Sequence, residues 1–193
     1  KTQRRLAIGA EVLTDGAIDF RVWAPRCRKV EVIVDDGTVI KLDAKPKGYF
    51  STQTSRAKVG DLYRYRLDRS ELLIPDPASR FQPEGPLGPS MIIDPAQFLW
   101  HDTDWKGVRI EGQVIYEIHI GTFTAAGTWK AAGQQLNELK DLGVTVLEIM
   151  PVNDFCGRFG WGYDGVDFFA PKRLYGSPDD FRPFIDDGHA LGF

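Results

Sequence analysis

The sequence is poor in the residues that cross-link small secreted domains or hold metal ions. Its two cysteines, Cys27 and Cys156, lie far apart on different predicted layers, so we expect no disulfide framework and a reducing, cytoplasmic location. Its three histidines, His101, His119 and His189, have no spacing that would bring them together on a helix or loop. We therefore expect no zinc site, no other metal and no cofactor.

Long apolar runs and an excess of positive charge are also missing. No window approaches the ~18 apolar residues of a membrane-spanning helix, and the basic start KTQRR lacks the apolar core of a signal peptide. The formal net charge is -3, whereas phosphate binding requires a basic stripe. We therefore expect neither a nucleic-acid partner nor a membrane partner.

The first third of the sequence is typical of short strands separated by turns. Alternating apolar and polar side chains and flanking turn residues predict strands at 18–23, 30–34, 38–43, 49–54 and 62–67. On the last of these, Tyr63 and Tyr65 share one face because side chains alternate along a strand. So many short strands without a convincing helix predict an antiparallel, immunoglobulin-like β-sandwich over residues 1–72.

A proline-rich connector is predicted to follow, over residues 73–112. Six of the twelve prolines lie between 73 and 95, and proline removes a donor from a sheet while fixing its own φ. The apolar side chains of Phe81, Ile92 and Ile93 are not needed in a solvated, flexible linker. We therefore expect an irregular segment that lies over the surface of two domains.

From residue 113 the periodicity changes. Strands are predicted at 114–120 and 144–150, and their apolar character suits a parallel sheet buried on both faces. Between them Thr128 can cap a helix that ends at Gly143, a position that favours a residue tolerant of positive φ. A strand, a helix and a strand in so short a stretch predict a right-handed βαβ unit.

A long connection rich in glycine and aromatic residues comes next, from Gly157 to Gly176. Aromatic side chains are costly to leave in water unless they pack or bind something, and glycine allows unusual backbone conformations. Ser177 to Asp180 then supplies a helix start, with a cap, a proline and two acids at the positive end of the helix dipole. Because the connection follows an apolar strand, it predicts one wall of a ligand site.

Four stretches resemble the start of the barrel of the α-amylase superfamily, glycoside hydrolase family 13. They are residues 116–123 (YEIHIGTF), 139–151 (LKDLGVTVLEIMP), 160–165 (GWGYDG) and 175–181 (YGSPDDF). Upstream, residues 20–25 (FRVWAP) and 62–67 are similar to the immunoglobulin-like domain that precedes such barrels. Within the superfamily the chain is most similar to the maltooligosyltrehalose trehalohydrolase family, and next to glycogen branching enzymes.

The resemblance implies an N-terminal sandwich followed by the first βαβα segment of a TIM (β/α)8 barrel, truncated, over residues 113–193. It also implies the N-terminal portion of a retaining hydrolase that acts on α-glucan or maltooligosyltrehalose and releases trehalose by cleaving an α-1,4 bond. Retaining hydrolysis needs two carboxyl groups about 5 Å apart, and in the family these come from later strands. We therefore expect no catalytic residue in this chain, which should be inactive alone.

Size leads to the same expectation without the family. A closed eightfold barrel needs roughly 200 or more residues, so only an incomplete one is expected here, with open edges that permit self-association.

The resemblance also marks substrate-binding residues in the glycine-rich connection. It implies that Tyr163 stacks under the sugar next to the cleaved bond, that Asp164 bonds sugar hydroxyls or orients a basic group, and that Trp161 lies beside them. The residues alone leave other roles open, since Tyr163 or Trp161 can simply pack against the sheet.

Other polar residues are not expected to carry catalysis. Glu117 and Glu148 lie in the middles of adjacent predicted strands, where they suit ion pairs inside a barrel. Barrel active sites occupy the C-terminal ends of strands, where Asp154 lies, yet it too is not expected to be a catalyst. His119 is expected to hydrogen-bond within the core rather than to act as an acid.

Two alternative functions stay open. One is a glycogen branching or debranching relative, which the sequence around the missing acids would distinguish. The other is a non-catalytic glucan-binding module built on the sandwich, with Trp23 among the aromatic residues that would hold the sugar.

Overall fold

Alternating apolar side chains fold the first part of the chain into two antiparallel sheets. The computed structural model describes residues 4–193, and every element below lies in that range. The first sheet has the order β1 (Gly9–Val12), β2 (Ile18–Trp23), β6 (Tyr49–Thr54) and β5 (Asp43–Lys45). The second has the order β4 (Val39–Lys41), β3 (Val30–Val34), β7 (Leu62–Leu67) and β8 (Leu73–Ile74), and β9 (Ser90–Met91) also pairs with β7.

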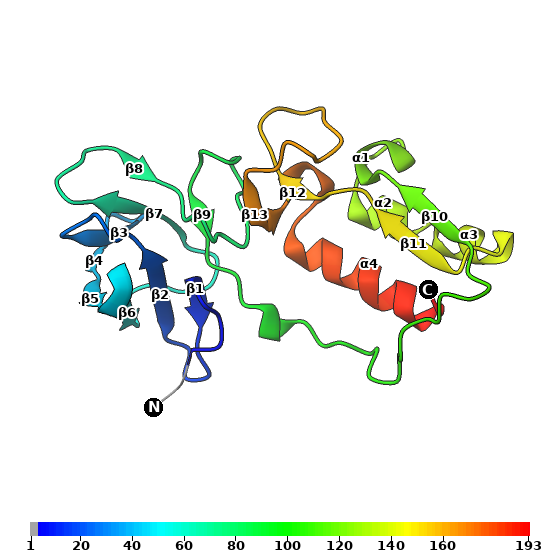
Figure 1. Cartoon of the computed structure of the whole chain (residues 1–193), viewed down its shortest axis with the longest axis horizontal. Coiled ribbons are helices and arrows are strands. Elements are labelled where there is room, and N and C mark those ends of the chain that lie inside the picture. The colour runs from blue at the N-terminus through cyan, green and yellow to red at the C-terminus, as the bar shows by residue number, and fades with distance from the viewer. Residues whose placement is uncertain (1–3) are drawn as a thin grey trace.

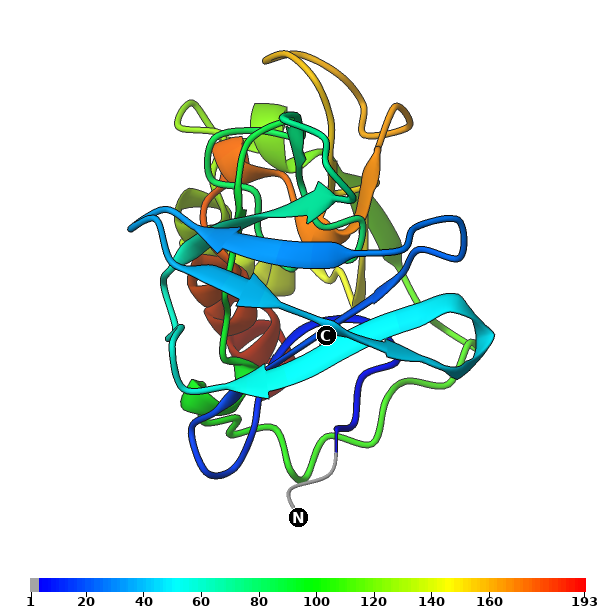
Figure 2. The same cartoon turned by 90° about the vertical axis from the view of Figure 1, so that its left-hand side faces the viewer.

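The two sheets share one apolar core. Ile18 and Phe20 of the first sheet and Val32 and Tyr65 of the second are fully buried and belong to the same cluster. Figure 2 views this part with its blue and cyan strands in front of the helices. The predicted all-β first part is confirmed, whereas its assignment to the immunoglobulin-like type stays a prediction.

One predicted strand, at residues 38–43, is wrong as a single element. In the structure β4 pairs with β3 in the second sheet, whereas β5 pairs with β6 in the first. Between them Leu42 is buried in the core, and its N–H donates to the carbonyl of Val30 at 3.0 Å. The chain crosses from one sheet to the other at Leu42, a change of partner that alternation alone does not reveal.

The predicted connector begins as part of the second sheet. Both β8 and β9 pair with β7, and Ile92 is fully buried in the same core. The chain then becomes irregular except for a short 3-10 helix at Pro95–Gln97, and it runs along one side of the second part (Figure 1). The domain boundaries at residues 72 and 112 stay a proposal.

The second part contains the predicted βαβ unit. β10 (Ile115–Ile118) and β11 (Val146–Ile149) are parallel, with Glu117 opposite Glu148. Between them lie α1 (Ile120–Phe123), α2 (Trp129–Gly133) and α3 (Leu136–Leu142). Thr128 caps α2, since its Oγ1 accepts from the N–H of Ala131 at 3.3 Å, and Gly143 ends α3 with a φ of 95°.

Three expectations for this unit were wrong in detail. The single predicted helix is divided at Gln134 and Gln135, where the N–H of Gln135 donates to the carbonyl of Ala132 in a tighter turn. The first strand ends at Ile118 because His119 is the N-cap of α1. The sheet is not buried on both faces, since Ile118 packs against the helices while Ile115 is exposed.

The last segments form a hairpin and a long helix. β12 (Asn153–Asp154) and β13 (Asp167–Pro171) are antiparallel, and a 3-10 helix at Arg173–Tyr175 leads to α4 (Pro178–Ala190). The predicted start of α4 is confirmed, because the backbone N–H of Ser177 donates to Asp180 Oδ2 at 2.8 Å. None of the helices within residues 4–193 has the length and apolar character needed to cross a bilayer.

Candidate functional site

The loop that joins β12 to β13 projects from the molecule in both views (Figures 1 and 2). A short ladder of hydrogen bonds holds its base. The N–H of Val166 donates to the carbonyl of Asp154 at 3.0 Å, and the amide of Asn153 donates to the carbonyl of Phe168 at 2.9 Å. The loop therefore rises from a fixed hairpin.

A buried ion cluster anchors the start of this loop. Asp154 is fully buried, 3.0 Å from Arg173 Nη1 and 3.3 Å from Lys172 Nζ. Lys172 also donates to the carbonyls of Phe155 at 2.7 Å and Gly157 at 2.8 Å, and burial lowers the pKa of its ammonium. Because a buried charge is tolerated when it is paired and hydrogen-bonded, this cluster is structural. Asp154 is thus engaged in the fold, and its non-catalytic role stays a prediction.

Glycines occupy the positions where the loop packs against its base. A Cβ at Gly160 would lie 2.7 Å from the ring of Phe155, and one at Gly165 would lie 2.7 Å from Cβ of Asn153. Gly162 has a φ of 86°, and a Cβ there would overlap the carbonyl oxygen of Pro151. The loop backbone therefore lies closer to the hairpin than any side chain would allow.

The aromatic residues between these glycines point outward. Trp161 is 72% exposed and Tyr163 is 70% exposed, and Phe159 and Phe168 are also exposed. Tyr163 is therefore not packed against the sheet. Such a group of exposed aromatic rings on a fixed backbone is typical of a binding surface.

The loop offers one exposed acid beside these rings. Asp164 is exposed, and no hydrogen bond or ion pair joins its carboxylate to another residue in the range 4–193. Asp154 and Asp167 are buried at the base, where burial and then the charge of Asp154 raise the pKa of Asp167 to about 6. The loop thus carries Trp161, Tyr163 and Asp164 as exposed side chains and has no pair of exposed carboxylates, while their role in binding stays a prediction.

His119 links this loop to the rest of the second part. Its Nε2 lies 3.0 Å from the carbonyl oxygen of Gly160 and 3.0 Å from the hydroxyl of Tyr175, and its Nδ1 lies 3.0 Å from Thr122 Oγ1. Its expected hydrogen-bonding role is confirmed, but these partners were not predicted. Gly121 is the one nearby residue that hints at the contact with Tyr175. A Cβ at this position would lie 2.8 Å from the Tyr175 ring, so only glycine fits there.

The other two acids considered for catalysis lie elsewhere. Glu117 and Glu148 are register partners in the middles of β10 and β11, and both are exposed. They lie on the face shared with the exposed Ile115, in a different sheet from the β12–β13 hairpin that carries the loop. Their pairing with cations inside a barrel stays a prediction.

Several known proteins of similar sequence carry the same description. No family model matches the chain. It is 44% identical over 180 residues to the malto-oligosyltrehalose trehalohydrolase of Saccharolobus solfataricus, which covers 93% of this chain and 32% of that protein. The protein of the same name from Deinococcus radiodurans is 40% identical over 189 residues, covering 97% of this chain and 31% of that protein. The chain spans about a third of these relatives, and the resemblance drawn from the motifs is confirmed.

A solved structure agrees with these relatives. A crystal structure of a Salmonella typhimurium protein assigned as an alpha amylase matches with a TM-score of 0.92 and 42% identity. The match covers 98% of this chain and 32% of that one. Over this stretch the chain therefore has the fold of an alpha-amylase-family protein, with a β-rich first part.

Proposed function

We propose that this chain is part of an α-glucan-active glycoside hydrolase that releases trehalose from maltooligosyltrehalose by retaining hydrolysis of an α-1,4 bond. The observation that carries this proposal is the similarity to trehalohydrolases over more than nine-tenths of the chain. The rigid loop with outward aromatic rings supports it, because a glucan-binding surface needs such a platform.

The loop would bind the substrate through three side chains. The ring of Tyr163 suits the apolar C–H face of a glucose unit, and Trp161 offers a second ring beside it. The free carboxylate of Asp164 would accept hydrogen bonds from sugar hydroxyls, which are strengthened by its charge. Because Gly160, Gly162 and the buried ion cluster fix the backbone, little conformational entropy is lost on binding.

The chain alone is proposed to be inactive. Retaining hydrolysis requires two carboxyl groups about 5 Å apart on either side of the bond, and Asp164 is the one exposed acid of the loop. We therefore assign the catalytic acids to a part of the enzyme beyond this chain. In this proposal residues 113–193 begin a (β/α)8 barrel, and the exposed face around Ile115 is where copies of the isolated chain would self-associate.

Affinity electrophoresis in a gel containing maltodextrin tests the binding surface. We expect the chain to be retarded, and Tyr163→Ala or Trp161→Ala to abolish most of this effect. Trp23→Ala is the control, because Trp23 is also an exposed aromatic side chain but lies on β2. Retardation lost in Trp23→Ala and retained in Tyr163→Ala would instead favour a glucan-binding module built on the two sheets.

The enzyme proposal has its own test in the full-length protein. Tyr163→Ala should sharply lower turnover of maltooligosyltrehalose without affecting folding, and wild-type kinetics would contradict the role of Tyr163. Product analysis separates the alternatives, since a branching enzyme forms new branch points and releases no trehalose.

A further inference from the structure

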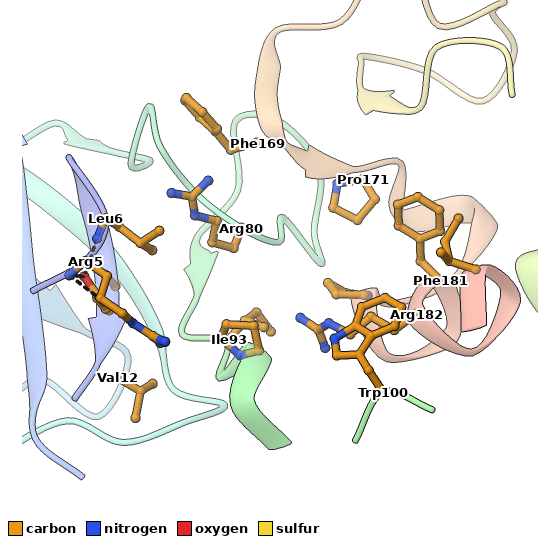
Figure 3. Close-up of a pocket in the computed structure, with 15 residues that line it drawn as sticks. Arg5, Leu6, Val12, Arg80, Ile93, Trp100, Phe169, Pro171, Phe181 and Arg182 are labelled. Carbon is orange, nitrogen blue, oxygen red and sulfur yellow. Dashed lines mark hydrogen bonds and ion pairs between the residues drawn. The ribbon is translucent and has the colours of Figure 1, made fainter. Parts of the chain in front are cut away.

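An apolar cavity of about 450 Å³ lies between the two parts of the chain (Figure 3). One wall is formed by the edge strand β1 with Val12, and the opposite wall by α4 with Phe181. The connector closes it with Ile93 and Trp100. Neither Trp161, Tyr163 nor Asp164 lines this cavity, so it is separate from the proposed glucan surface.

Three arginines surround this apolar space. The guanidinium groups of Arg5 and Arg182 point into it from opposite sides in Figure 3. Arg80 lies against the ring of Phe169, 4.7 Å from its centroid, and its Nε is buried without a hydrogen-bond partner among residues 4–193. The cavity therefore combines apolar walls with the guanidinium groups of Arg5 and Arg182.

Two acids near the cavity are each paired with one of these arginines, Glu11 with Arg5 and Asp179 with Arg182. Glu11 lines the cavity, with its Oε1 3.5 Å from Arg5 Nε, and its carboxylate also accepts from the backbone N–H groups of Arg5 and Leu6, each at 2.9 Å. Arg182 pairs with Asp179, whose side chain is 74% exposed and therefore screened by water, whereas the Arg182 side chain is only 14% exposed. Three arginines and one acid line the cavity, so its lining keeps an excess of positive charge beside apolar walls.

We propose that this cavity binds an amphipathic carboxylate, with its apolar chain against Val12 and Ile93 and its head group between Arg5 and Arg182. The volume lies in the range of about 300 to 1,000 Å³ that small-ligand sites occupy, and such sites are frequent between domains. A sugar does not fit this chemistry, because its hydroxyls would lose water without gaining partners along the apolar walls. A carboxylate satisfies the guanidinium donors directly.

Calorimetric titration of the 193-residue chain with octanoate and with octanol tests this site. The two probes share an apolar chain and differ in charge. We expect saturable binding of one octanoate per chain, with octanol about tenfold weaker or more, because one charged hydrogen bond accounts for such a factor. Arg182→Gln should weaken octanoate about tenfold and leave octanol unchanged.

Two further variants separate the cavity from general apolar binding. Val12→Trp should fill the cavity and abolish binding of both probes, whereas Val108→Trp, in a different cavity beside Trp105, should change neither. Circular dichroism checks the fold of each variant, and Arg5→Gln repeats the charge test at an exposed side chain if Arg182→Gln does not fold. The proposal would be overturned if octanoate did not bind or if octanol bound with the same affinity as octanoate. It would also be overturned if a folded Val12→Trp variant bound octanoate as well as the wild type does.

Discussion

His101 and Asp186 are 85 residues apart in the sequence and are joined by two hydrogen bonds. The backbone N–H of His101 donates to Asp186 Oδ1 at 2.9 Å, and its ring Nδ1 lies 2.8 Å from Oδ2. A second pair runs in the opposite sense, with His189 of α4 2.7 Å from Asp102. Trp105 stacks on the His189 ring at 3.8 Å. These contacts fasten the end of the connector along α4.

We expect Asp186→Asn to lower the melting temperature and to loosen this segment. The hydrogen bonds from His101 lower the pKa of the Asp186 carboxyl. A lowered pKa in the folded state means that the stabilisation is present above about pH 4, where the unfolded carboxyl ionises, and is lost as pH falls through the folded pKa. The melting temperature of the variant should therefore fall less on acidification than that of the wild type.

Asp187→Asn is the matched control for this prediction, because Asp187 is the neighbouring acid on α4 and is exposed. Differential scanning calorimetry between about pH 3 and pH 7 measures both variants across the range where carboxyls titrate. Equal losses in the two variants would show that the His101 contact does not stabilise the chain.

The aromatic loop should depend sharply on Gly162. Gly162 and Gly157 have similar φ values, 86° and 83°, but a Cβ at Gly162 would overlap the carbonyl oxygen of Pro151, whereas a Cβ at Gly157 has nothing within 4 Å. Gly157→Ala should therefore lower the free energy of unfolding by only about 1 to 2 kcal/mol, the strain of a left-handed backbone at alanine. Gly162→Ala should cost at least about 2 kcal/mol more, because the loop must also move.

Urea unfolding gives the two free energies, and trypsin cleavage after the exposed Arg158 reports on the loop itself. Cleavage should become faster in Gly162→Ala and change little in Gly157→Ala. If the two variants behave alike, the loop does not pack against Pro151 as the structure has it.

The sequence predicted those features whose cause lies within a few residues. Alternation placed Tyr63 and Tyr65 on one buried face, and local capping patterns located the end of α3 at Gly143 and the start of α4 at Ser177. The glycines and aromatic rings around Trp161 predicted a long loop that packs or binds something, but only the structure shows that Trp161 and Tyr163 are exposed.

The features that sequence reasoning missed depend on distant partners. Lys172 is fully buried only because Asp154 and the carbonyls of the loop start surround it, and nothing next to Lys172 in the sequence indicates this. The change of sheet at Leu42 is set by the strands on either side. His101 and His189 showed no pattern because each is paired with an aspartate on another segment.

The start of the connector should be held by a buried carboxylate. Asp76 is fully buried and accepts hydrogen bonds from the hydroxyl of Tyr63 at 2.7 Å and that of Tyr65 at 3.3 Å. Burial raises the pKa of both hydroxyls, so they stay protonated and donate. Tyr63→Phe should cost about 2 kcal/mol in urea unfolding, because it leaves a buried charge with one partner fewer.

The hydrogen bond from Tyr65 to Asp76 is longer, so Tyr65→Phe should lower the free energy of unfolding by less. Tyr49→Phe is the control and should have little effect, because the Tyr49 ring is partly exposed. In an Asp76→Asn background the cost of Tyr63→Phe should shrink, since the charge is gone. An unchanged cost there would assign the effect to packing.

The hairpin below the aromatic loop should have a pH dependence of its own. Asp167 is buried opposite Asp154, its Oδ2 has no hydrogen-bond partner among residues 4–193, and its pKa is raised from 3.8 to about 6. A raised pKa in an acid means that the folded chain holds the proton more tightly than the unfolded chain. Stability from this group is therefore present at low pH and is lost as pH rises through about 6.

Asp167→Asn removes this ionisation and keeps the size of the side chain. Relative to the wild type, its free energy of unfolding should rise by about 2 kcal/mol between about pH 4.5 and about pH 8. Asp164→Asn, at the exposed acid of the same loop, should show no such trend in parallel urea titrations. A flat difference for Asp167→Asn would mean that Asp167 is ionised and solvated in the folded chain, and that the hairpin opens at neutral pH.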